Sequence, residues 1–239
     1  MKKTLIKNIG LLASPRGFAA QGGQAQGDIV TLKDAYVLIE DGRIAQVGSG
    51  TPPGLEADVI DAGRQLVTPG LVDAHTHLVF GGWRAHEMQM KLAGVPYLDI
   101  LAQGGGILST VRATRAASAK ELEDKAASAL DEMLRLGVTT AEAKSGYGLN
   151  LAEEIKQMEV VKALNLRQPV QLVSTLMAAH AVPEEYQENR RVFIDLIIQE
   201  IIPVAAQSDL ATFCDIFCET GVFSVEESRE ILLAAKTHG

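Results

Sequence analysis

Two histidines separated by one residue, His75 and His77, are the side chains best suited to chemistry in this chain. They lie in the apolar run 71–80, which is typical of a buried strand. On a strand, residues i and i+2 point to the same face, so the two imidazoles can bind one divalent metal. Asp73 is spaced to orient one of the rings. Such a pair alone is a weak signal for metal, since it is more often two partly exposed histidines without one, so the surrounding sequence must decide.

Four strand segments, each followed by a helix segment, are expected to position this pair and the polar residues behind later strands. The strands are nearly all apolar, which is typical of a parallel sheet covered by helices. In such sheets, polar groups at the carboxyl ends of the strands carry the chemistry. The predicted strands are residues 71–80, 138–143, 170–177 and 213–218, and the predicted helices are residues 118–136, 151–166, 186–204 and 224–236.

The first 68 residues are expected to form β-structure instead. Two alternating apolar runs flank Asp41 and Gly42, which predicts a hairpin because glycine tolerates the positive φ of a tight turn. Residues 14–28 are rich in glycine, glutamine and alanine and predict a loop between strands. We therefore predict two domains: residues 1–68, the N-terminal part of a composite β-sandwich, and residues 69–239, which hold the strand–helix units.

The composition of the chain argues against several classes of function. The formal net charge is −8 and the pI about 5.2, so the chain repels the phosphates of nucleic acid. Two cysteines make no disulfide framework, which favours a reducing cytoplasm. The basic start lacks the apolar core of a signal peptide, and no apolar run approaches the ~18 residues of a membrane span. The sequence thus predicts a cytoplasmic protein that binds neither nucleic acid nor membrane.

Six blocks of the sequence together resemble one family of enzymes. The run around the histidine pair resembles the first-strand signature of the amidohydrolase superfamily, and the later blocks resemble the imidazolonepropionases, a family within it. The resemblance extends from about residue 34 to residue 239. The blocks are VTPGLVDAHTHLVFGG (67–82), GGWRAHE (81–87), AQGGGILSTVRATRAAS (102–118), VTTAEAKSGYGL (138–149), STLMAAHAVP (174–183) and FCDIFCETGVFSVEESR (213–229).

The resemblance also implies a fold. A closed eight-unit barrel needs roughly 250 residues, whereas residues 70–239 hold four units, so length alone leaves an open doubly wound sheet or half a barrel. The family implies the second. We therefore predict an α/β fold, the first half of a (β/α)8 TIM-like barrel preceded by a small N-terminal β-sandwich segment.

The family's functional residues carry over to five positions of this chain. His75 and His77 match two ligands of one divalent metal, zinc or iron, both of which suit imidazole. Arg84 matches the arginine that binds the substrate's propionate carboxylate, a role suited to the fork of a guanidinium. Tyr147 matches a tyrosine that contacts the substrate. His180 matches a catalytic histidine that contacts the ring, where it could polarise the carbonyl under attack.

The activity implied by the resemblance is hydrolysis of the small molecule 4-imidazolone-5-propanoate to N-formimidoyl-L-glutamate by a metal-activated water. The family's complete site needs a further histidine from the fifth strand and an aspartate from the eighth. We therefore expect the chain alone to be an inactive fragment, or to pair with another chain; a homodimer is also compatible. Two alternatives remain: another cyclic-amide amidohydrolase or a deaminase, and a non-catalytic half-barrel that binds a partner chain.

Overall fold

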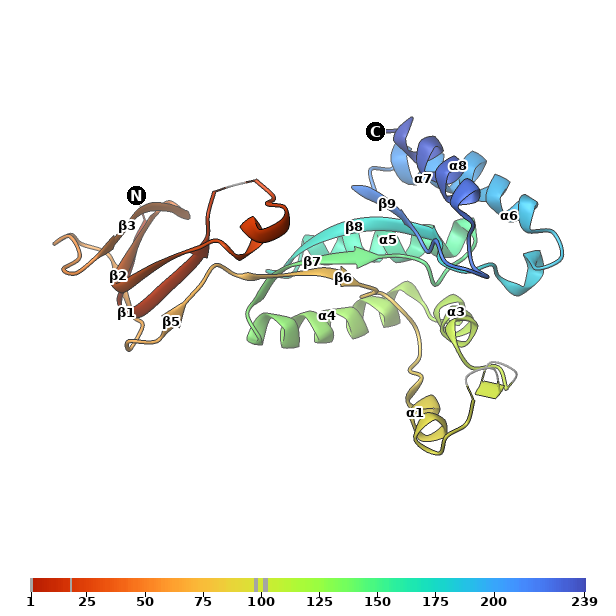
Figure 1. Ribbon diagram of the computed structural model, residues 1–239, viewed down its shortest axis with the longest axis horizontal. Helices are drawn as coiled ribbons and strands as arrows, with labels where there is room; N and C mark the ends of the chain where they lie inside the picture. Colours follow the sequence, from red (N-terminus) through yellow and green to blue (C-terminus); the bar gives the residue numbers. More distant parts are fainter. Residues whose placement is uncertain (1, 18, 97–98, 101–102) are drawn as a thin grey trace. The chain divides into compact units, whose positions relative to one another are not determined.

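The computed structural model describes residues 2–17, 19–96, 99–100 and 103–239. The chain divides into two compact units, Met1–Gly70 and Leu71–Gly239, whose elements are labelled in Figure 1. Phe18, in the predicted loop 14–28, and Ala102, which begins the third sequence block, lie outside the described residues. None of the helices that the structure describes has the length and hydrophobicity needed to cross a membrane.

The first unit is a five-stranded sheet. Its strands are β1 (Lys3–Pro15), β2 (Ile29–Glu40), β3 (Arg43–Ser49), β4 (Asp58–Asp61) and β5 (Leu66–Val67). The order is β3-β2-β1-β4, with β5 paired to β1. Residues 16–28 connect β1 to β2, so the predicted loop 14–28 is present except for its first two residues, which belong to β1. The connection contains a short 3-10 turn, η1 (Gly23–Gly27).

The predicted hairpin is confirmed at β2 and β3, which pair antiparallel. Asp41 and Gly42 form its two-residue turn with φ values of 49° and 78°. Two consecutive positive φ angles match the right-handed twist of the flanking strands, and they favour an Asp-Gly pair. Alternating residues of the sheet form two apolar clusters, one with Leu5, Tyr36 and Leu38 and the other with Ile9, Ala35 and Val37.

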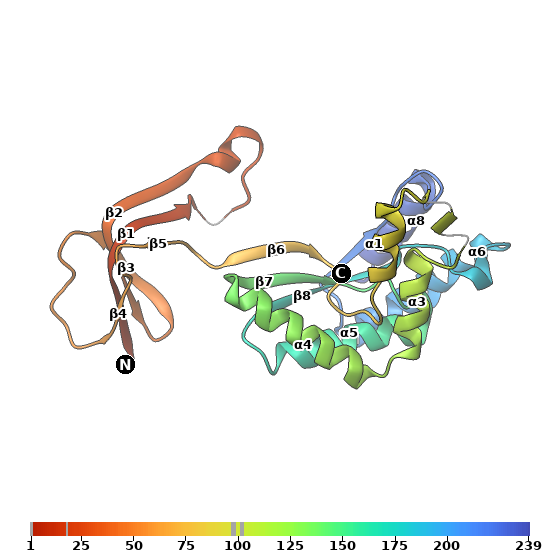
Figure 2. The same cartoon turned by 90° about the horizontal axis from the view of Figure 1, so that it is seen from below.

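The second unit contains a parallel four-stranded sheet in the order β6-β7-β8-β9. The strands are β6 (Leu71–Thr76), β7 (Val138–Lys144), β8 (Gln171–Ala179) and β9 (Phe213–Ile216). Strand order therefore follows chain order, as in a barrel, and the sheet curls (Figures 1 and 2). The predicted fold, half of a (β/α)8 barrel preceded in the sequence by a β-segment, is confirmed.

Helices cover this sheet as the alternating pattern predicted. They include α4 (Ala119–Arg135), which packs on β7, α5 (Leu151–Asn165), which packs on β8, and α8 (Val225–Lys236), which packs on β9. The helices α4 and α5 lie side by side beneath the sheet in Figure 2. Ser118 and Ser224 each cap a helix by accepting from the backbone N–H three residues on, and a glutamate there bonds back to the serine backbone. These capping boxes explain why α4 and α8 begin where the sequence predicted.

The structure differs from the predicted helices in two places. Between β6 and β7 it adds α1 (Ala85–Leu92) and α3 (Ile107–Ala116), which are short and lack a side-chain cap. The single helix predicted for residues 186–204 is instead η2 (Glu184–Tyr186), α6 (Arg190–Leu196), a π-helical turn η3 (Ile197–Ile201) and α7 (Ile202–Gln207). Pro203 lies in the first turn of α7, where it cannot donate a backbone hydrogen bond, and the wider π turn precedes it.

Candidate functional site

The predicted site residues follow three neighbouring strands of the second unit. His75 lies within β6 and His77 directly after it, Tyr147 lies in the loop after β7, and His180 follows β8. Arg84 precedes the first turn of α1. The carboxyl ends of parallel strands meet at one edge of a sheet, so these residues converge although up to about a hundred positions separate them.

Four of the five predicted residues form one cluster of rings. The imidazoles of His77 and His180 stack, with centroids 4.4 Å apart and planes 8° from parallel. The Tyr147 ring lies 5.0 Å from His77 and 5.2 Å from His180. The His75 ring is 6.1 Å from that of His77, at 68° to it. The structure therefore brings together the residues expected to bind a metal and the residues expected to contact a substrate.

Backbone carbonyls fix the orientation of two of these imidazoles. Nδ1 of His77 lies 2.8 Å from the carbonyl oxygen of Ser145, and Nδ1 of His180 lies 2.9 Å from that of Gly146. A carbonyl oxygen only accepts, so each Nδ1 must carry the proton. In the neutral rings, each Nε2 is then left with its lone pair. A histidine that binds a metal through one nitrogen typically donates from the other to such an oxygen.

The environment keeps His77 uncharged at neutral pH. Burial lowers the pKa of His77, and the nearby His180 and His75 lower it further, to about 4, although the hydrogen bond to Ser145 acts in the opposite direction. Burial likewise lowers the pKa of His180. Metal ligation requires a neutral imidazole, so His77 is in the form that a divalent ion needs.

The depressed pKa of His77 predicts a pH dependence of stability. Between its folded value of about 4 and the ordinary value of 6.5, the unfolded chain takes up a proton that the folded chain excludes. The contribution of His77 to the free energy of unfolding is thus complete above pH 6.5 and should decrease as the pH falls towards 4. Urea unfolding of the metal-free chain and of His77→Gln would measure this. Parallel pH profiles for the two proteins would contradict the expectation.

A small cavity lies beside the ring cluster. Its volume is about 200 Å³, and it is lined by His77, Phe80, Trp83, Arg84, Thr110 and Tyr147. Arg84 is exposed and brings a positive charge to it. Burial raises the pKa of Tyr147, and the charge of Arg84 partly opposes that shift. The cavity therefore combines an arginine suited to a carboxylate with a neutral phenol and an imidazole.

A lysine that the sequence analysis did not single out holds the segment in front of Arg84. Nζ of Lys125, on α4, lies 3.3 Å from the ring centroid of Phe80 and 3.9 Å from that of Trp83. It also donates to the carbonyl oxygen of Gly82, at 2.5 Å. An ammonium between two aromatic faces is attracted by both. These contacts tie residues 80–83, and with them the wall of the cavity, to α4.

Replacing Lys125 with methionine should loosen this segment, because the two aromatic contacts and the hydrogen bond are lost. We expect the free energy of unfolding to fall by about 1 kcal/mol. Trp83 is the single tryptophan of the chain, so its fluorescence reports the site directly. Trp83 is already 72% exposed, so the expected change is in the mobility of its ring, and its fluorescence anisotropy should fall. Lys120→Met on the same helix is the control, because the side chain of Lys120 is 71% exposed and pairs only with Asp124 among described residues. An equal fall of the anisotropy in both variants would count against the contact of Lys125 with the two rings.

Lys144 lies in an ion cluster on the sheet. Its ammonium is 2.9 Å from Glu142 and 2.7 Å from Asp215, and its side chain is 5% exposed. Burial lowers the pKa of Lys144, but the hydrogen bonds to Asp215 and Glu142 outweigh it, and the pKa is raised overall. The two carboxylates therefore keep the amine of Lys144 protonated.

The donor set for a metal is partial in the part of the chain that the structure describes. No group of three or more histidine, cysteine, aspartate or glutamate side chains there is arranged to hold a metal ion. His75 and His77 nevertheless fit the role of two ligands. His77 has its Nδ1 occupied by Ser145 and its Nε2 free, and His75 is exposed beside it.

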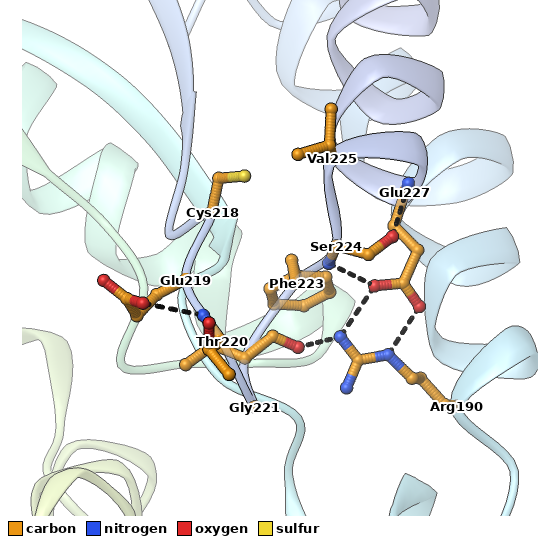
Figure 3. Close-up of a pocket in the computed structure, with 10 residues that line it drawn as sticks. Arg190, Cys218, Glu219, Thr220, Gly221, Phe223, Ser224, Val225 and Glu227 are labelled. Carbon is orange, nitrogen blue, oxygen red and sulfur yellow. Dashed lines mark hydrogen bonds and ion pairs between the residues drawn. The ribbon is translucent and has the colours of Figure 1, made fainter.

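A second cavity lies at the loop between β9 and α8, with a volume of about 550 Å³ (Figure 3). Arg190 spans it, donating to both carboxylate oxygens of Glu227 and to the carbonyl oxygen of Val222, while its guanidinium covers the Phe223 ring at 4.7 Å. The charges of Arg190 and Glu227 are thus paired with each other. Cys218, which also lines this cavity, is exposed because it follows the end of β9.

Comparison with solved structures places the fold in a known class. An amidohydrolase matches with a TM-score of 0.59 at 19% identity, covering 100% of this chain and 55% of that chain. An atrazine chlorohydrolase from Arthrobacter aurescens, solved with zinc and atraton, matches with a TM-score of 0.55 at 17% identity, covering 98% of this chain and 51% of that chain. The second unit therefore has the half-barrel fold of the amidohydrolases.

Sequence comparison is more specific. The imidazolonepropionase of Alkaliphilus metalliredigens is 49% identical over 245 residues, covering 100% of this chain and 58% of the relative. That of Streptococcus gordonii is 54% identical over 212 residues, covering 87% and 50%. No protein-family model matches the chain. The resemblance to imidazolonepropionases inferred from the sequence blocks is confirmed, and the chain spans about half the length of these relatives.

Proposed function

We propose that this chain supplies the metal-binding and substrate-binding part of an active site that hydrolyses the ring amide of 4-imidazolone-5-propanoate to N-formimidoyl-L-glutamate. The observation that carries the proposal is the convergence of His77, His180 and Tyr147 at neighbouring strand ends, with ring centroids 4.4 to 5.2 Å apart. The sequence identity of 49% and 54% to two imidazolonepropionases supports the choice of this substrate over other cyclic amides.

His75 and His77 are the proposed metal ligands. When bound, a divalent zinc or iron ion supplies Lewis-acid activation of water. Ser145 holds the Nδ1 side of His77 and directs its Nε2 lone pair outward, as a ligand requires. A catalytic zinc typically has three protein ligands, so further ligands must come from residues other than those described here.

Arg84, Tyr147 and His180 are the proposed substrate contacts. The guanidinium of Arg84 pairs with the propionate carboxylate and fixes the far end of the substrate. The ring amide is thereby held in one orientation relative to the catalytic groups. Tyr147 lines the same cavity as Arg84. Because Nδ1 of His180 donates to Gly146, the neutral ring offers Nε2 only as an acceptor. To polarise the ring carbonyl, His180 must first take a second proton, which its burial opposes.

A substrate panel tests the proposal. The purified chain, supplied with zinc or ferrous iron, is incubated separately with 4-imidazolone-5-propanoate, hydantoin and guanine. Opening of the first two rings and deamination of guanine are followed by ultraviolet absorbance. Binding of each compound is measured in parallel by calorimetry. Selective ring opening or selective binding of the propionate compound supports the proposal, the second result meaning that this chain provides only part of the machinery. Hydrolysis of hydantoin or guanine instead, or no binding of the propionate compound, would overturn it.

Replacing Arg84 with alanine should weaken binding of the propionate compound by roughly 10- to 100-fold, the value of a charge-assisted bidentate pair. Where turnover is measurable, KM should rise while kcat stays within a few-fold. The matched compound is an imidazolone without the carboxylate, whose binding should be unchanged. Lys91→Ala, which removes an exposed cation from α1, is the control for net charge. Equal affinity of wild type and Arg84→Ala would remove Arg84 from this role.

A further inference from the structure

Two side chains of α5 bind four backbone N–H groups of the loop between β7 and α5, residues 145–150. These four consecutive groups, from Gly146 to Leu149, all point towards the helix, whereas the N–H of Ser145 donates to the carbonyl oxygen of Thr175. The N–H of Gly146 donates to Oε2 of Glu154 at 3.1 Å, those of Gly148 and Leu149 donate to Oε1 of Glu154 at 2.8 Å each, and that of Tyr147 donates to Oε1 of Gln157 at 3.2 Å.

The opposite sides of the same peptide units hold the two stacked imidazoles. The carbonyl of Ser145 and the N–H of Gly146 belong to one planar trans peptide, so they point in opposite directions. Glu154 binds that N–H, and the carbonyl receives Nδ1 of His77.

The next peptide unit repeats the arrangement for the other imidazole. Gln157 binds the N–H of Tyr147, and the carbonyl of Gly146 in the same unit receives Nδ1 of His180. Each imidazole is thus connected to a different α5 side chain through one rigid peptide. Rotation of either peptide would turn its carbonyl away from its ring.

Both α5 side chains are themselves firmly held. Glu154 and Gln157 are 0% and 1% exposed. Nε2 of Gln157 donates to the carbonyl oxygen of Val79 at 2.6 Å, which fixes the amide so that Oε1 faces the loop. Burial raises the pKa of Glu154, whereas its backbone donors and the Ser145 hydroxyl favour the carboxylate. Neither residue lines the cavity beside Tyr147.

We propose that Glu154 and Gln157 are positioning residues that separately orient His77 and His180, each acting through a single peptide unit. Glu154 keeps His77 in the tautomer that leaves Nε2 free for a metal, and Gln157 keeps His180 in the tautomer whose Nε2 faces a substrate. The purposes of the two rings rest on the proposed function, whereas the positioning itself concerns only this chain.

The test observes the rings directly. The metal-free chain is labelled with ¹⁵N-histidine, and the tautomers of its five histidines are read from long-range ¹H–¹⁵N spectra at neutral pH, with resonances assigned by single histidine substitutions. Glu154→Gln places an amide group against the N–H of Gly146, and Gln157→Met removes the acceptor of Tyr147. The control is Glu159→Gln, the same substitution at an exposed position of α5.

We expect Glu154→Gln to lower the ratio of Nδ1–H to Nε2–H tautomer roughly 10-fold at His77, with His180 unchanged, because one hydrogen bond is lost. Gln157→Met should do the same at His180 and leave His77 unchanged. Glu159→Gln should alter neither. If Glu154→Gln fails to fold, Glu154→Asp, which keeps the charge but shortens its reach, replaces it. Folded variants with unchanged tautomers, or with both rings equally altered by either substitution, would overturn the proposal.

The result is independent of the proposed activity, because it uses neither metal nor substrate. Ring-selective tautomer shifts in a chain that fails the substrate panel would support the positioning role and overturn the proposed function. Selective binding of the propionate compound by a chain without such shifts would do the reverse.

Discussion

Replacing Gly146 with alanine is expected to lower the free energy of unfolding by about 3 kcal/mol and to displace His180. Gly146 has φ = 105°, which L side chains rarely adopt. A Cβ added there would lie 2.8 Å from the carbonyl oxygen of Met177 and 2.9 Å from Cβ and Nδ1 of His180. The backbone oxygen of Met177 cannot move away, so the steric clash is relieved by displacement of the His180 imidazole. Denaturant unfolding measures the first effect, and histidine NMR measures the second.

Gly221 provides the matched control for this substitution. It also has a positive φ, of 82°, but nothing lies within 4 Å of an added Cβ. Gly221→Ala should therefore show only the backbone penalty, about 1 kcal/mol, and leave the histidine spectrum unchanged. If Gly146→Ala were no more destabilising than Gly221→Ala, the close packing of the loop against His180 would be refuted.

Replacing Lys144 with methionine is expected to destabilise the chain by about 2 kcal/mol. Removing one partner of a buried ion pair leaves uncompensated charge and typically has a larger effect, but Asp215 is 40% exposed and water screens it. Despite burial, the hydrogen bond from Lys144 keeps the pKa of Asp215 below its ordinary 3.8. The stabilisation it gives is therefore complete above pH 3.8 and is lost as the pH falls further, so wild type and variant should converge in acid.

A double substitution separates the ion pair from the packing of the lysine chain. In Lys144→Met combined with Asp215→Asn, one of the two orphaned carboxylates is gone, so the loss should be smaller than the sum of the two single losses. Chemical denaturation of the four proteins at neutral pH gives the coupling energy. Strict additivity would mean that the contact between Lys144 and Asp215 contributes nothing to stability.

The regular parts of the fold could be predicted because their signals are local. The apolar strands, the capping serines Ser118 and Ser224 and the Asp41–Gly42 turn each carry their information within a few residues. The helices α1 and α3 were missed because they are short and lack side-chain caps. The π turn before α7 depends on how the chain accommodates Pro203, for which a helical pattern gives no warning.

The sequence indicated the histidines of the candidate site, but not the residues that hold them and the neighbouring cavity wall in place. His77 and His180 stand out because they follow apolar strands within family motifs. Gln157 does not, because its role depends on a contact with Val79, 78 positions earlier, and on the path of a loop. Lys125 likewise has an ordinary place on a charged helix until Phe80 is brought beneath it. One usable signal was present: Glu154 and Gln157 are polar residues three apart on the buried face of α5.

The strand order β6-β7-β8-β9 has a consequence for how the second unit is made. Each new strand is added beside its predecessor, and no later strand has to be inserted between two earlier ones. Loop closure therefore involves only the chain between successive strands, which keeps its entropic barrier low. During synthesis, each strand–helix unit can dock on the preceding one as it leaves the ribosome. The imidazoles of His75 and His77 would then become ordered only after β7 and β8 have docked beside β6. The site would therefore assemble in the direction of translation.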